Sequence, residues 1–376
     1  MIKSSPKGLI GHFLVIKDPR KERTKKHKLI DIFVIAICGI ISGFETWVDI
    51  EEWAILNEKW LKKYLELSNG IPSHDTLGRV FSMINPKIFK KQFLKWVQEI
   101  REITDGQVIS IDGKTVRRSF DKEKGNKAIH LVNAWCNENQ LFLAQEKVYE
   151  KSNEITAIPK LLDILDVNGC IITMDAMGYQ REIAKKIIEK KADYVLAIKQ
   201  NQKVFFEDIT PYFEDVDIKQ HTTKNYDWYQ TIEKDHGRIE KRTYCSFSNI
   251  TWLKNKHSWI GLNSITQVIS ERTIRNQTSK ETRYFISSLP ASAKKIGHAI
   301  RSHWGIENAC HWVLDVTFNE DQSRVRIGHA AENLSLLRKT ALNLLKQEKS
   351  LSKKSLRIKR LHASQDKNYL AKVMGI

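Results

Sequence analysis

The sequence is poor in cysteine and has no two cysteines at short spacing. Its five cysteines, Cys38, Cys136, Cys170, Cys245 and Cys310, lie far apart. Without a CxxC pair, a zinc knuckle or a dithiol redox motif is not expected. An odd number of scattered cysteines in a chain of 376 residues suits a reducing compartment. We therefore expect a cytoplasmic protein.

Long apolar runs are also missing. The apolar stretch over residues 30–43 carries Asp31 and is too short to span a bilayer. The start of the sequence lacks the apolar core and cleavage site of a signal peptide. No internal repeat is found, and no helix-turn-helix pattern is clear in residues 1–100. The sequence thus points away from a membrane protein and contains no recognisable helix-turn-helix in residues 1–100.

Acidic residues are outnumbered by basic ones. The chain has 44 Asp and Glu against 62 Lys and Arg, which gives a net charge of +18 spread along its length. A protein this basic commonly binds a polyanion, and nucleic acid is the first candidate. An incidental basic surface is the alternative. Since 41% of the residues are hydrophobic, a sizeable core is expected and global disorder is not.

The hydrophobic patterns predict a helical region over residues 1–104, followed by an α/β region over 105–346. Ser73 is predicted to cap a helix that begins at His74 in the first region, and Ser292 could cap the long helix that carries Glu307 in the second. The second region reads as three strands in a meander, then helix, strand, helix and strand, and then long helices.

Two parts differ from this pattern. Alternating aromatic and β-branched residues predict an all-β insertion over residues 222–289. Residues 347–376 are rich in Lys and Arg, and we interpret them as a solvated tail that strengthens DNA binding nonspecifically.

Two predicted strands stop on an aspartate. The run 108–111 ends at Asp112, and the run 170–174 ends at Asp175. Carboxylates at the mouth of a sheet can hold a hard cation. The order of elements matches the ribonuclease-H-like arrangement, in which acids lie in the first strand, after the fourth strand and on the last helix. Glu307 falls at the third of these places, so the three acids predict a site for two Mg²⁺ or Mn²⁺ ions that cuts phosphodiester bonds.

Other readings of these residues remain open. A lone aspartate after a strand is often a turn or cap residue. Four further acids compete with Glu307 for the third position: Asp315, Glu320, Asp321 and Glu332. His303 and His311 share a helical face with Glu307 and could bind metal, although core or DNA-contacting histidines are the plainer interpretation.

Several basic and polar residues beside these motifs could contact DNA. One group follows Asp112 and the other follows the fifth strand; the alternatives are a solvated basic loop and a helix-starting loop. The candidates are Lys114, Arg117 and Arg118 in the first group, and Lys199, Asn201 and Gln202 in the second.

Seven motifs occur in order along nearly the whole chain. They are DPR at 18–20, GIPSHDT at 70–76, IDGKTVRRS at 111–119, KSNEITAIPKLL at 151–162, MDAMGYQ at 174–180, DYVLAIKQNQ at 193–202, and HWGIEN at 303–308 continuing through HWVLDVTFNEDQSRVR at 311–326. On these motifs the chain resembles bacterial insertion-sequence transposases of the DDE type, closest to the H-repeat-associated, ISAs-type branch.

The resemblance implies a ribonuclease-H-like catalytic core with a β insertion, preceded by a small helical domain. It implies Mg²⁺-dependent cleavage and strand transfer at terminal inverted repeats, with catalytic and metal-binding roles for Asp112, Asp175 and Glu307. The partners would be transposon-end and target DNA and further copies of the chain, in a dimer or larger synapse near the bacterial nucleoid.

The chain departs from many related transposases on the helix of Glu307. Where they carry Tyr, Arg and Lys, it has Ile300, His303 and Leu314. Arg301 or His303 could take over the binding of the end phosphates. Two rival functions also stay open: a metal-dependent nuclease that cuts without joining, and a former transposase kept as a non-catalytic DNA-binding protein.

Overall fold

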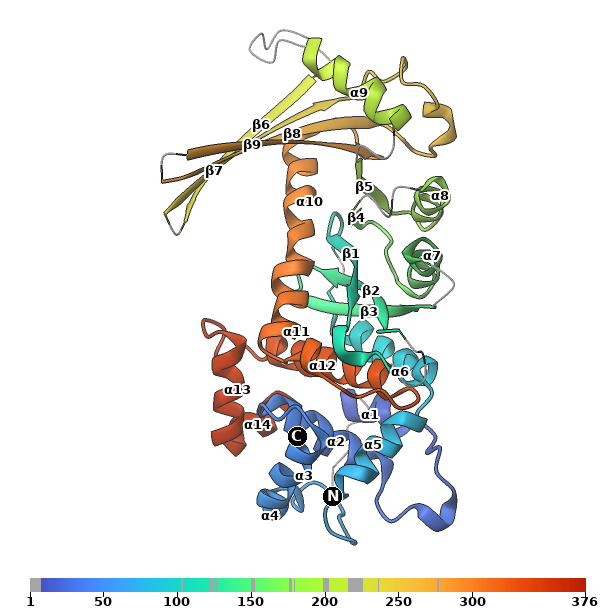
Figure 1. Ribbon diagram of the computed structural model, residues 1–376, viewed down its shortest axis with the longest axis vertical. Helices are drawn as coiled ribbons and strands as arrows, with labels where there is room; N and C mark the ends of the chain where they lie inside the picture. Colours follow the sequence, from blue (N-terminus) through green and yellow to red (C-terminus); the bar gives the residue numbers. More distant parts are fainter. Residues whose placement is uncertain are drawn as a thin grey trace.

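Nine strands of the described chain form one continuous sheet in the computed structural model (Figure 1). The structure describes residues 8–376 except 103, 122–124, 126, 150–152, 176, 177, 179, 199–202, 216–225, 236 and 276. The strands are β1 (Val108–Thr115), β2 (His130–Cys136), β3 (Leu141–Val148), β4 (Ile171–Met174), β5 (Asp193–Ile198), β6 (Tyr226–Asp235), β7 (Arg238–Phe247), β8 (Ser264–Ile274) and β9 (Gln277–Ser287). Their order across the sheet is β3-β2-β1-β4-β5-β9-β8-β7-β6.

The first five strands confirm the predicted order of elements. β1, β2 and β3 form an antiparallel meander, and β4 and β5 continue from β1 in parallel. The helices α7 (Glu154–Ile164) and α8 (Arg181–Glu189) make the two crossovers. Ile111 pairs with Met174 in the parallel register, so Asp112 and Asp175 follow at the same edge of the sheet.

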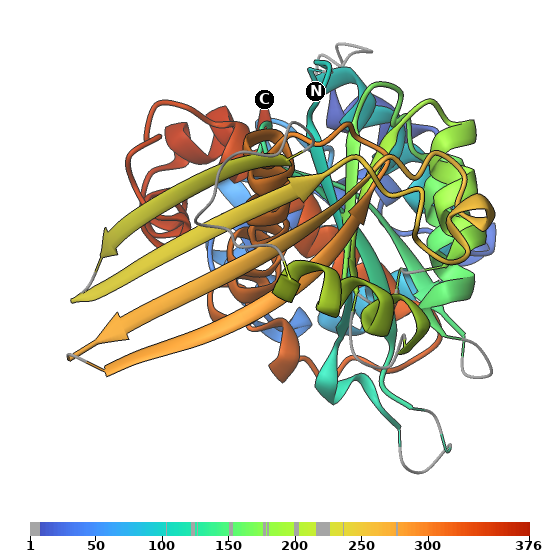
Figure 2. The same cartoon turned by 90° about the horizontal axis from the view of Figure 1, so that it is seen from above.

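The other four strands extend the same sheet. β9 pairs antiparallel with β5, and the pairing then runs through β8 and β7 to β6. The hairpins β6–β7 and β8–β9 project well beyond the rest of the molecule (Figure 2). The strands lie at residues 226–287, within the stretch where the alternating sequence predicted β structure.

Helices cover both faces of the central strands. Figure 1 shows α10 (Ala293–Ile306) on one face and α7 and α8 on the other. Ser292 caps α10 by accepting from the backbone N–H of Lys295, as its position before the helix predicted. The chain continues after α10 with a π-helical segment (Glu307–His311), α11 (Trp312–Val316) and α12 (Ala330–Gln347). The helix α9 (Lys203–Asp215) lies against the strands β6 to β9.

The N-terminal region is helical, as predicted. It consists of α1 (Leu9–Leu14), α2 (Leu29–Ile41), α3 (Trp47–Leu56), α4 (Glu58–Leu61), α5 (His74–Met83) and α6 (Pro86–Ile100). Ser73 caps α5 through the N–H of Thr76. α2 is apolar almost all round because it is covered by α1, α3, α12, α13 and α14. No helix in the described ranges is long and apolar enough to cross a membrane.

The prediction of a solvated basic tail is wrong. Residues after 355 form α13 (Leu356–Gln365) and α14 (Lys367–Met374), which pack on α2 and α12. Lys359 donates to the carbonyls of Leu345 and Glu348 at the end of α12, at 2.7 and 2.6 Å. Helix ends carry unpaired carbonyls, so part of the basic charge of this segment is used inside the protein.

Candidate metal centre

Asp112 lies on β1, and Asp175 directly follows the neighbouring strand β4. Two residues earlier, Ser110 and Thr173 have hydroxyls 3.2 Å apart, and Ser110 also donates to the carbonyl of Ser302 on α10. Since side chains alternate along a strand, the two aspartates are placed toward the same face. The described contacts therefore support the predicted pairing of strand ends.

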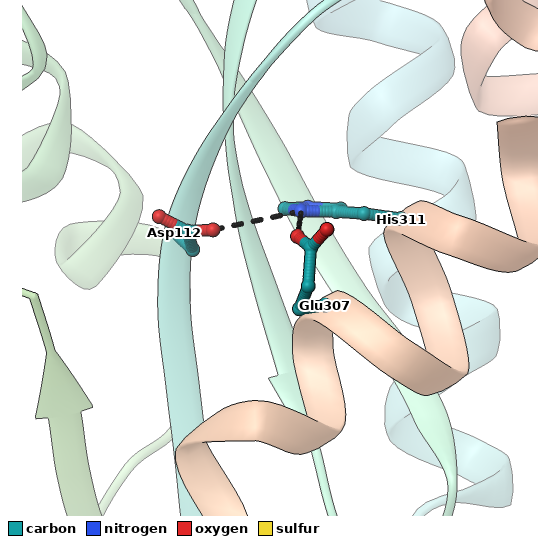
Figure 3. Close-up of side chains that lie close together, drawn as sticks. All are labelled: Asp112, Glu307 and His311. Carbon is teal, nitrogen blue, oxygen red and sulfur yellow. Dashed lines mark hydrogen bonds and ion pairs between the residues drawn. The ribbon is translucent and has the colours of Figure 1, made fainter. Parts of the chain in front are cut away.

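Glu307 reaches the same place from the segment that follows α10. This segment is a π-helix over Glu307–His311, a geometry that is frequent at functional sites. Nδ1 of His311 lies 3.3 Å from Oε2 of Glu307 and 3.5 Å from Oδ2 of Asp112 (Figure 3). One ligand atom from each of the three residues lies within 4.8 Å of the others.

A cavity of about 710 Å³ opens at this point. Asp112, Asp175 and Glu307 all line it, so the three predicted acids share one cavity. Its walls come from β4, β5, β9, α9 and α10 and include Val195, Phe206, Phe285, Ile300 and Trp304. Asp112 and Glu307 form a tight group with His311, and Asp175 lies at the neighbouring strand end.

The carboxylates of the site differ in pKa. Burial raises the pKa of Asp112 to about 6, and the nearby charges of Glu154 and Glu307 act in the same direction, while His311 opposes them. The hydrogen bond from His311 lowers the pKa of Glu307, which is more exposed. Clustered carboxylates that resist joint ionisation favour a cation between them.

His303 faces the cavity but is engaged with the sheet. Its Nδ1 lies 3.0 Å from the Thr173 hydroxyl, and burial lowers its pKa to about 4. It is therefore a neutral imidazole beside Asp175, which suits hydrogen bonding better than phosphate binding through charge.

Behind His311 lies a group of buried polar side chains that sequence reasoning missed. Asn133, on β2, contacts Nε2 of His311 at 3.1 Å, and Lys339, on α12, contacts both Asn133 and Gln145. All four side chains are almost completely buried. The available signal was a polar residue, Asn133, inside an apolar strand.

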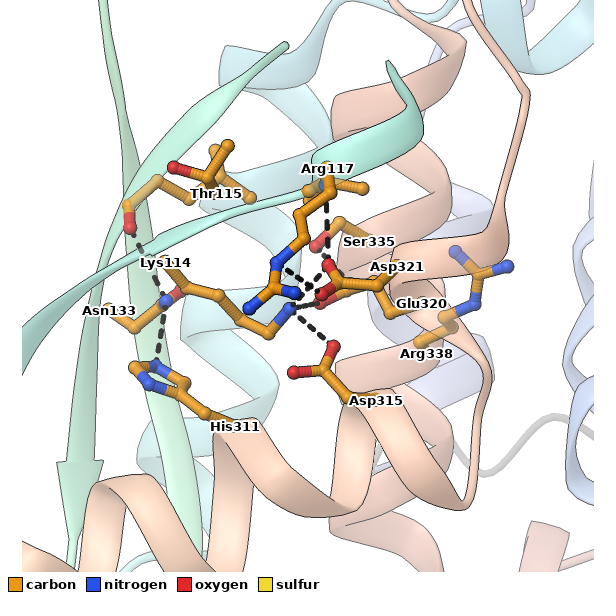
Figure 4. Close-up of polar contacts among 12 residues, drawn as sticks. Lys114, Thr115, Arg117, Asn133, His311, Asp315, Glu320, Asp321, Ser335 and Arg338 are labelled. Carbon is orange, nitrogen blue, oxygen red and sulfur yellow. Dashed lines mark hydrogen bonds and ion pairs between the residues drawn. The ribbon is translucent and has the colours of Figure 1, made fainter. Parts of the chain in front are cut away.

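Lys114, which was predicted as a DNA contact, is held by three acids and does not line the cavity. Its ammonium group is buried and lies 2.6 Å from Asp315, 3.3 Å from Glu320 and 3.2 Å from Asp321 (Figure 4). Three of the acids that competed with Glu307 are thus bound to one lysine. In this conformation Lys114 is not available to a phosphate.

The other predicted DNA contacts lie on the surface or outside the described residues. The side chain of Arg117 is 80% exposed although its Nε contacts Asp321, and Arg118 is exposed as well. Arg301 is exposed and pairs with Glu233 of β6 at 3.2 Å. Lys199, Asn201 and Gln202 fall outside the described residues.

The donor set fits a hard divalent cation. Carboxylate oxygens are the ligands that Mg²⁺ and Mn²⁺ prefer, and two of them already converge, with a third carboxylate on the same cavity. An acid with a raised pKa beside another carboxylate has lost solvation that a bound cation would replace.

Known protein families and relatives match nearly the whole chain. The family described as "Transposase DDE domain" matches residues 103–344, and the family described as "DDE_Tnp_1-associated" matches residues 10–97. "Putative transposase YncI" of Escherichia coli O157:H7 is 44% identical over 99% of this chain and 95% of its own length. "H repeat-associated putative transposase YhhI" of E. coli K12 is 41% identical over 98% of both chains. The predicted resemblance is confirmed.

One further relative and one solved structure show a partial likeness. "Inactive transposase YbfQ" of E. coli K12 is 43% identical over 20% of this chain. A piggyBac transposase, in a synaptic complex with hairpin DNA, covers 97% of this chain and 77% of its own at 11% identity, with a TM-score of 0.43.

Proposed function

The chain belongs to the DDE transposase family, and on this basis we propose that it binds terminal inverted repeats, hydrolyses a strand at each end and joins the freed 3′-hydroxyls to target DNA. The observation that carries the proposal is the convergence of Asp112 and Glu307, which are far apart in the sequence, on the cavity that Asp175 also lines. We further propose that Asp175 completes the ligand set.

The proposed fold of the catalytic region is ribonuclease-H-like, with β6–β9 as an insertion between β5 and α10. Support comes from the strand order β3-β2-β1-β4-β5, with β2 antiparallel and β4 parallel to β1. In the proposed domain division, residues 1–104 precede this region, which spans 105–346, and residues 347–376 follow.

In the proposed mechanism, the protein holds the metal and positions the DNA. Asp112, Asp175 and Glu307 would hold the divalent ions through their carboxylate oxygens. Bound there, Mg²⁺ or Mn²⁺ supplies an activated water and stabilises the leaving oxygen. The apolar cavity wall, with Phe285 and Ile300, limits competing water, which strengthens the electrostatic stabilisation.

DNA binding is proposed to rest on the basic surface. The net charge of +18 favours association with a duplex at moderate salt. Among the predicted contacts, Arg301 lines a neighbouring hollow that shares Ile300 and Trp304 with the cavity. Arg117 and Arg118 are exposed in the turn that directly follows β1. A dimer or larger synapse would be needed to join two ends.

The proposal is tested with an Asp112→Asn variant on DNA that carries the element's own ends. We expect Mg²⁺-dependent cleavage to be lost while end binding, measured by mobility shift, persists. Cleavage by a purified Asn variant would contradict the assignment. A strand-transfer assay with pre-cut ends identifies a nuclease if the wild type cuts but never joins, and absence of divalent-ion binding by calorimetry identifies a non-catalytic protein.

A further inference from the structure

A line of buried polar side chains runs from α12 along one face of the sheet to the candidate metal centre. Nζ of Lys339 lies 2.8 Å from Oδ1 of Asn133 and 2.7 Å from Oε1 of Gln145. Nδ2 of Asn133 lies 3.1 Å from Nε2 of His311 (Figure 4). The other ring nitrogen of His311, Nδ1, faces Asp112 and Glu307. The line therefore joins the core of α12 to two carboxylates.

The hydrogen-bond donors and acceptors along this line allow one orientation of the Asn133 amide and one position of the His311 ring proton. The Lys339 ammonium group can donate but not accept, so Asn133 must turn its oxygen toward it. The amide nitrogen of Asn133 then faces His311, and it also lies 3.4 Å from the carbonyl of Leu131, a second acceptor. Nε2 of His311 must accept this hydrogen bond, which places the ring proton on Nδ1.

Resting on the proposed function, we propose that His311 is a positioning residue of the metal centre. Asn133 and Lys339 fix its imidazole as the Nδ1–H tautomer, and this N–H donates between Asp112 and Glu307 and holds the two carboxylates together. Without such a donor the carboxylates repel each other before a cation arrives. Polar partners behind a site commonly set ligand orientation in this way.

The same contacts argue against His311 as a metal ligand. Ligation through Nδ1 needs a lone pair there, which moves the proton to Nε2. That proton would meet the N–H group of Asn133 at a 3.1 Å nitrogen separation, so two donors would face each other. Asn133 cannot turn over to relieve the clash, because its oxygen is held by Lys339.

The burial of Lys339 supports a role beyond packing. Its side chain has no exposed surface, and taking an ammonium group out of water carries a large desolvation cost. Methionine would fill a similar volume without that cost. What methionine lacks is a donor that can orient Asn133.

The first test reads the tautomer directly. Protein labelled with ¹⁵N-histidine is examined by long-range ¹H–¹⁵N correlation at neutral pH, and the His311 signals are assigned by their loss in His311→Asn. We expect a protonated Nδ1 and an unprotonated Nε2, unchanged when Mg²⁺ is added. In Asn133→Asp, whose carboxylate only accepts, Nε2 should gain a proton. A protonated Nε2 in the wild type, or loss of the Nδ1 proton with Mg²⁺, overturns the proposal.

The second test measures Mn²⁺ affinity by calorimetry in folded variants. His311→Leu removes the donor and should weaken binding roughly 10–100-fold, the usual effect of losing a partner of metal ligands. His311→Asn keeps an amide N–H near the position of Nδ1 and should stay within about threefold of the wild type. Equal affinity in His311→Leu and the wild type overturns the positioning role.

Failure of this inference can be told apart from failure of the proposed function. If the wild type binds no Mn²⁺, the metal centre itself is wrong, whatever the tautomer. If the wild type binds Mn²⁺ and cleaves DNA but His311 carries its proton on Nε2, the function stands and the positioning role falls. Thermal melting of each variant shows whether an affinity change reflects a folded protein.

Discussion

Asp112 illustrates how a functional carboxylate lowers the stability of the chain that carries it. Its pKa is about 6 in the folded protein, above the ordinary value of 3.8, because burial disfavours the charge. The folded chain therefore holds this proton more tightly than the unfolded chain. Stability falls as pH rises from about 4 to about 6, and the loss persists above that range.

We predict that Asp112→Asn stabilises the metal-free protein at neutral pH. The amide removes the cost of burying a charge, and the gain should be on the order of 1 kcal/mol, with partial exposure of the side chain taken into account. The difference should shrink toward zero below about pH 3, where the wild-type carboxyl is protonated in both the folded and the unfolded state. Urea unfolding in EDTA across this range measures it, with the exposed Glu52→Gln as a control. A less stable Asn variant at neutral pH would contradict the account.

Lys114 shows what a local pattern cannot predict. It follows Asp112 closely in the sequence, so a phosphate contact was a reasonable interpretation, yet its three partners lie about 200 positions further on. The position of a charged side chain depends on which opposite charges the fold brings next to it. By contrast, the places of Asp112 and Asp175 were predictable, because an acid at the end of a buried apolar strand lies near the edge of the sheet.

We predict that Lys114→Met destabilises the fold strongly. Three acids, of which Glu320 is fully buried, would lose their common cation, and breaking such a group costs about 3–5 kcal/mol. Adding Glu320→Gln should recover part of this loss. Arg117→Met, which changes an exposed arginine on the same segment, should alter stability little. Urea unfolding compares the three, and an equally stable Lys114→Met variant with weaker DNA binding would restore the phosphate-contact interpretation.

The helices that sequence predicted well are those with local start signals. Ser73 and Ser292 cap α5 and α10 through the expected backbone N–H groups. The π-helical segment after α10 has no such signal. In the π-helix, His311 contacts Asp112 of β1 and Asn133 of β2. An ordinary helix would turn Glu307 and His311 differently relative to the sheet. The expectation of one uninterrupted face through Glu307 therefore missed this detail.

We predict that deleting Asn308 restores an ordinary helix and disables the metal centre. Removing one residue rotates Glu307 by about 100° relative to His311 and α11, because each helical residue turns the chain by that angle. Asn308 is exposed, so the fold should survive. Mn²⁺ binding should fall at least about tenfold. Asn308→Ala, which keeps the length, should bind as the wild type does; retained binding in the deletion would mean that the π-helix is incidental.

Contacts between the two ends of the chain join the N-terminal helical region to α12 and α13. Arg360, on α13, donates to the carbonyl of Ile40 at 2.7 Å and pairs with Glu45 at 2.6 Å. Glu45 in turn lies 3.7 Å from Arg338 of α12. Composition predicted a tail here because Lys and Arg dominate the segment. Which of these charges face carbonyls and carboxylates depends on contacts between parts of the chain more than 300 positions apart.

We predict that ending the chain after Ser355 destabilises the protein rather than only weakening its affinity for DNA. The truncation uncovers α2 and removes the buried side chains of Leu370, Val373 and Met374. A loss of a few kcal/mol in a chain of this size should lower the melting temperature by roughly 5 °C or more. The double variant Lys353→Ala/Lys354→Ala removes two exposed charges beside the cut and should melt like the wild type. It should still bind DNA less tightly at low salt, since fewer counterions are released. If the truncated chain melted at the wild-type temperature and differed in DNA affinity alone, α13 and α14 would be the dispensable basic tail that the composition suggested.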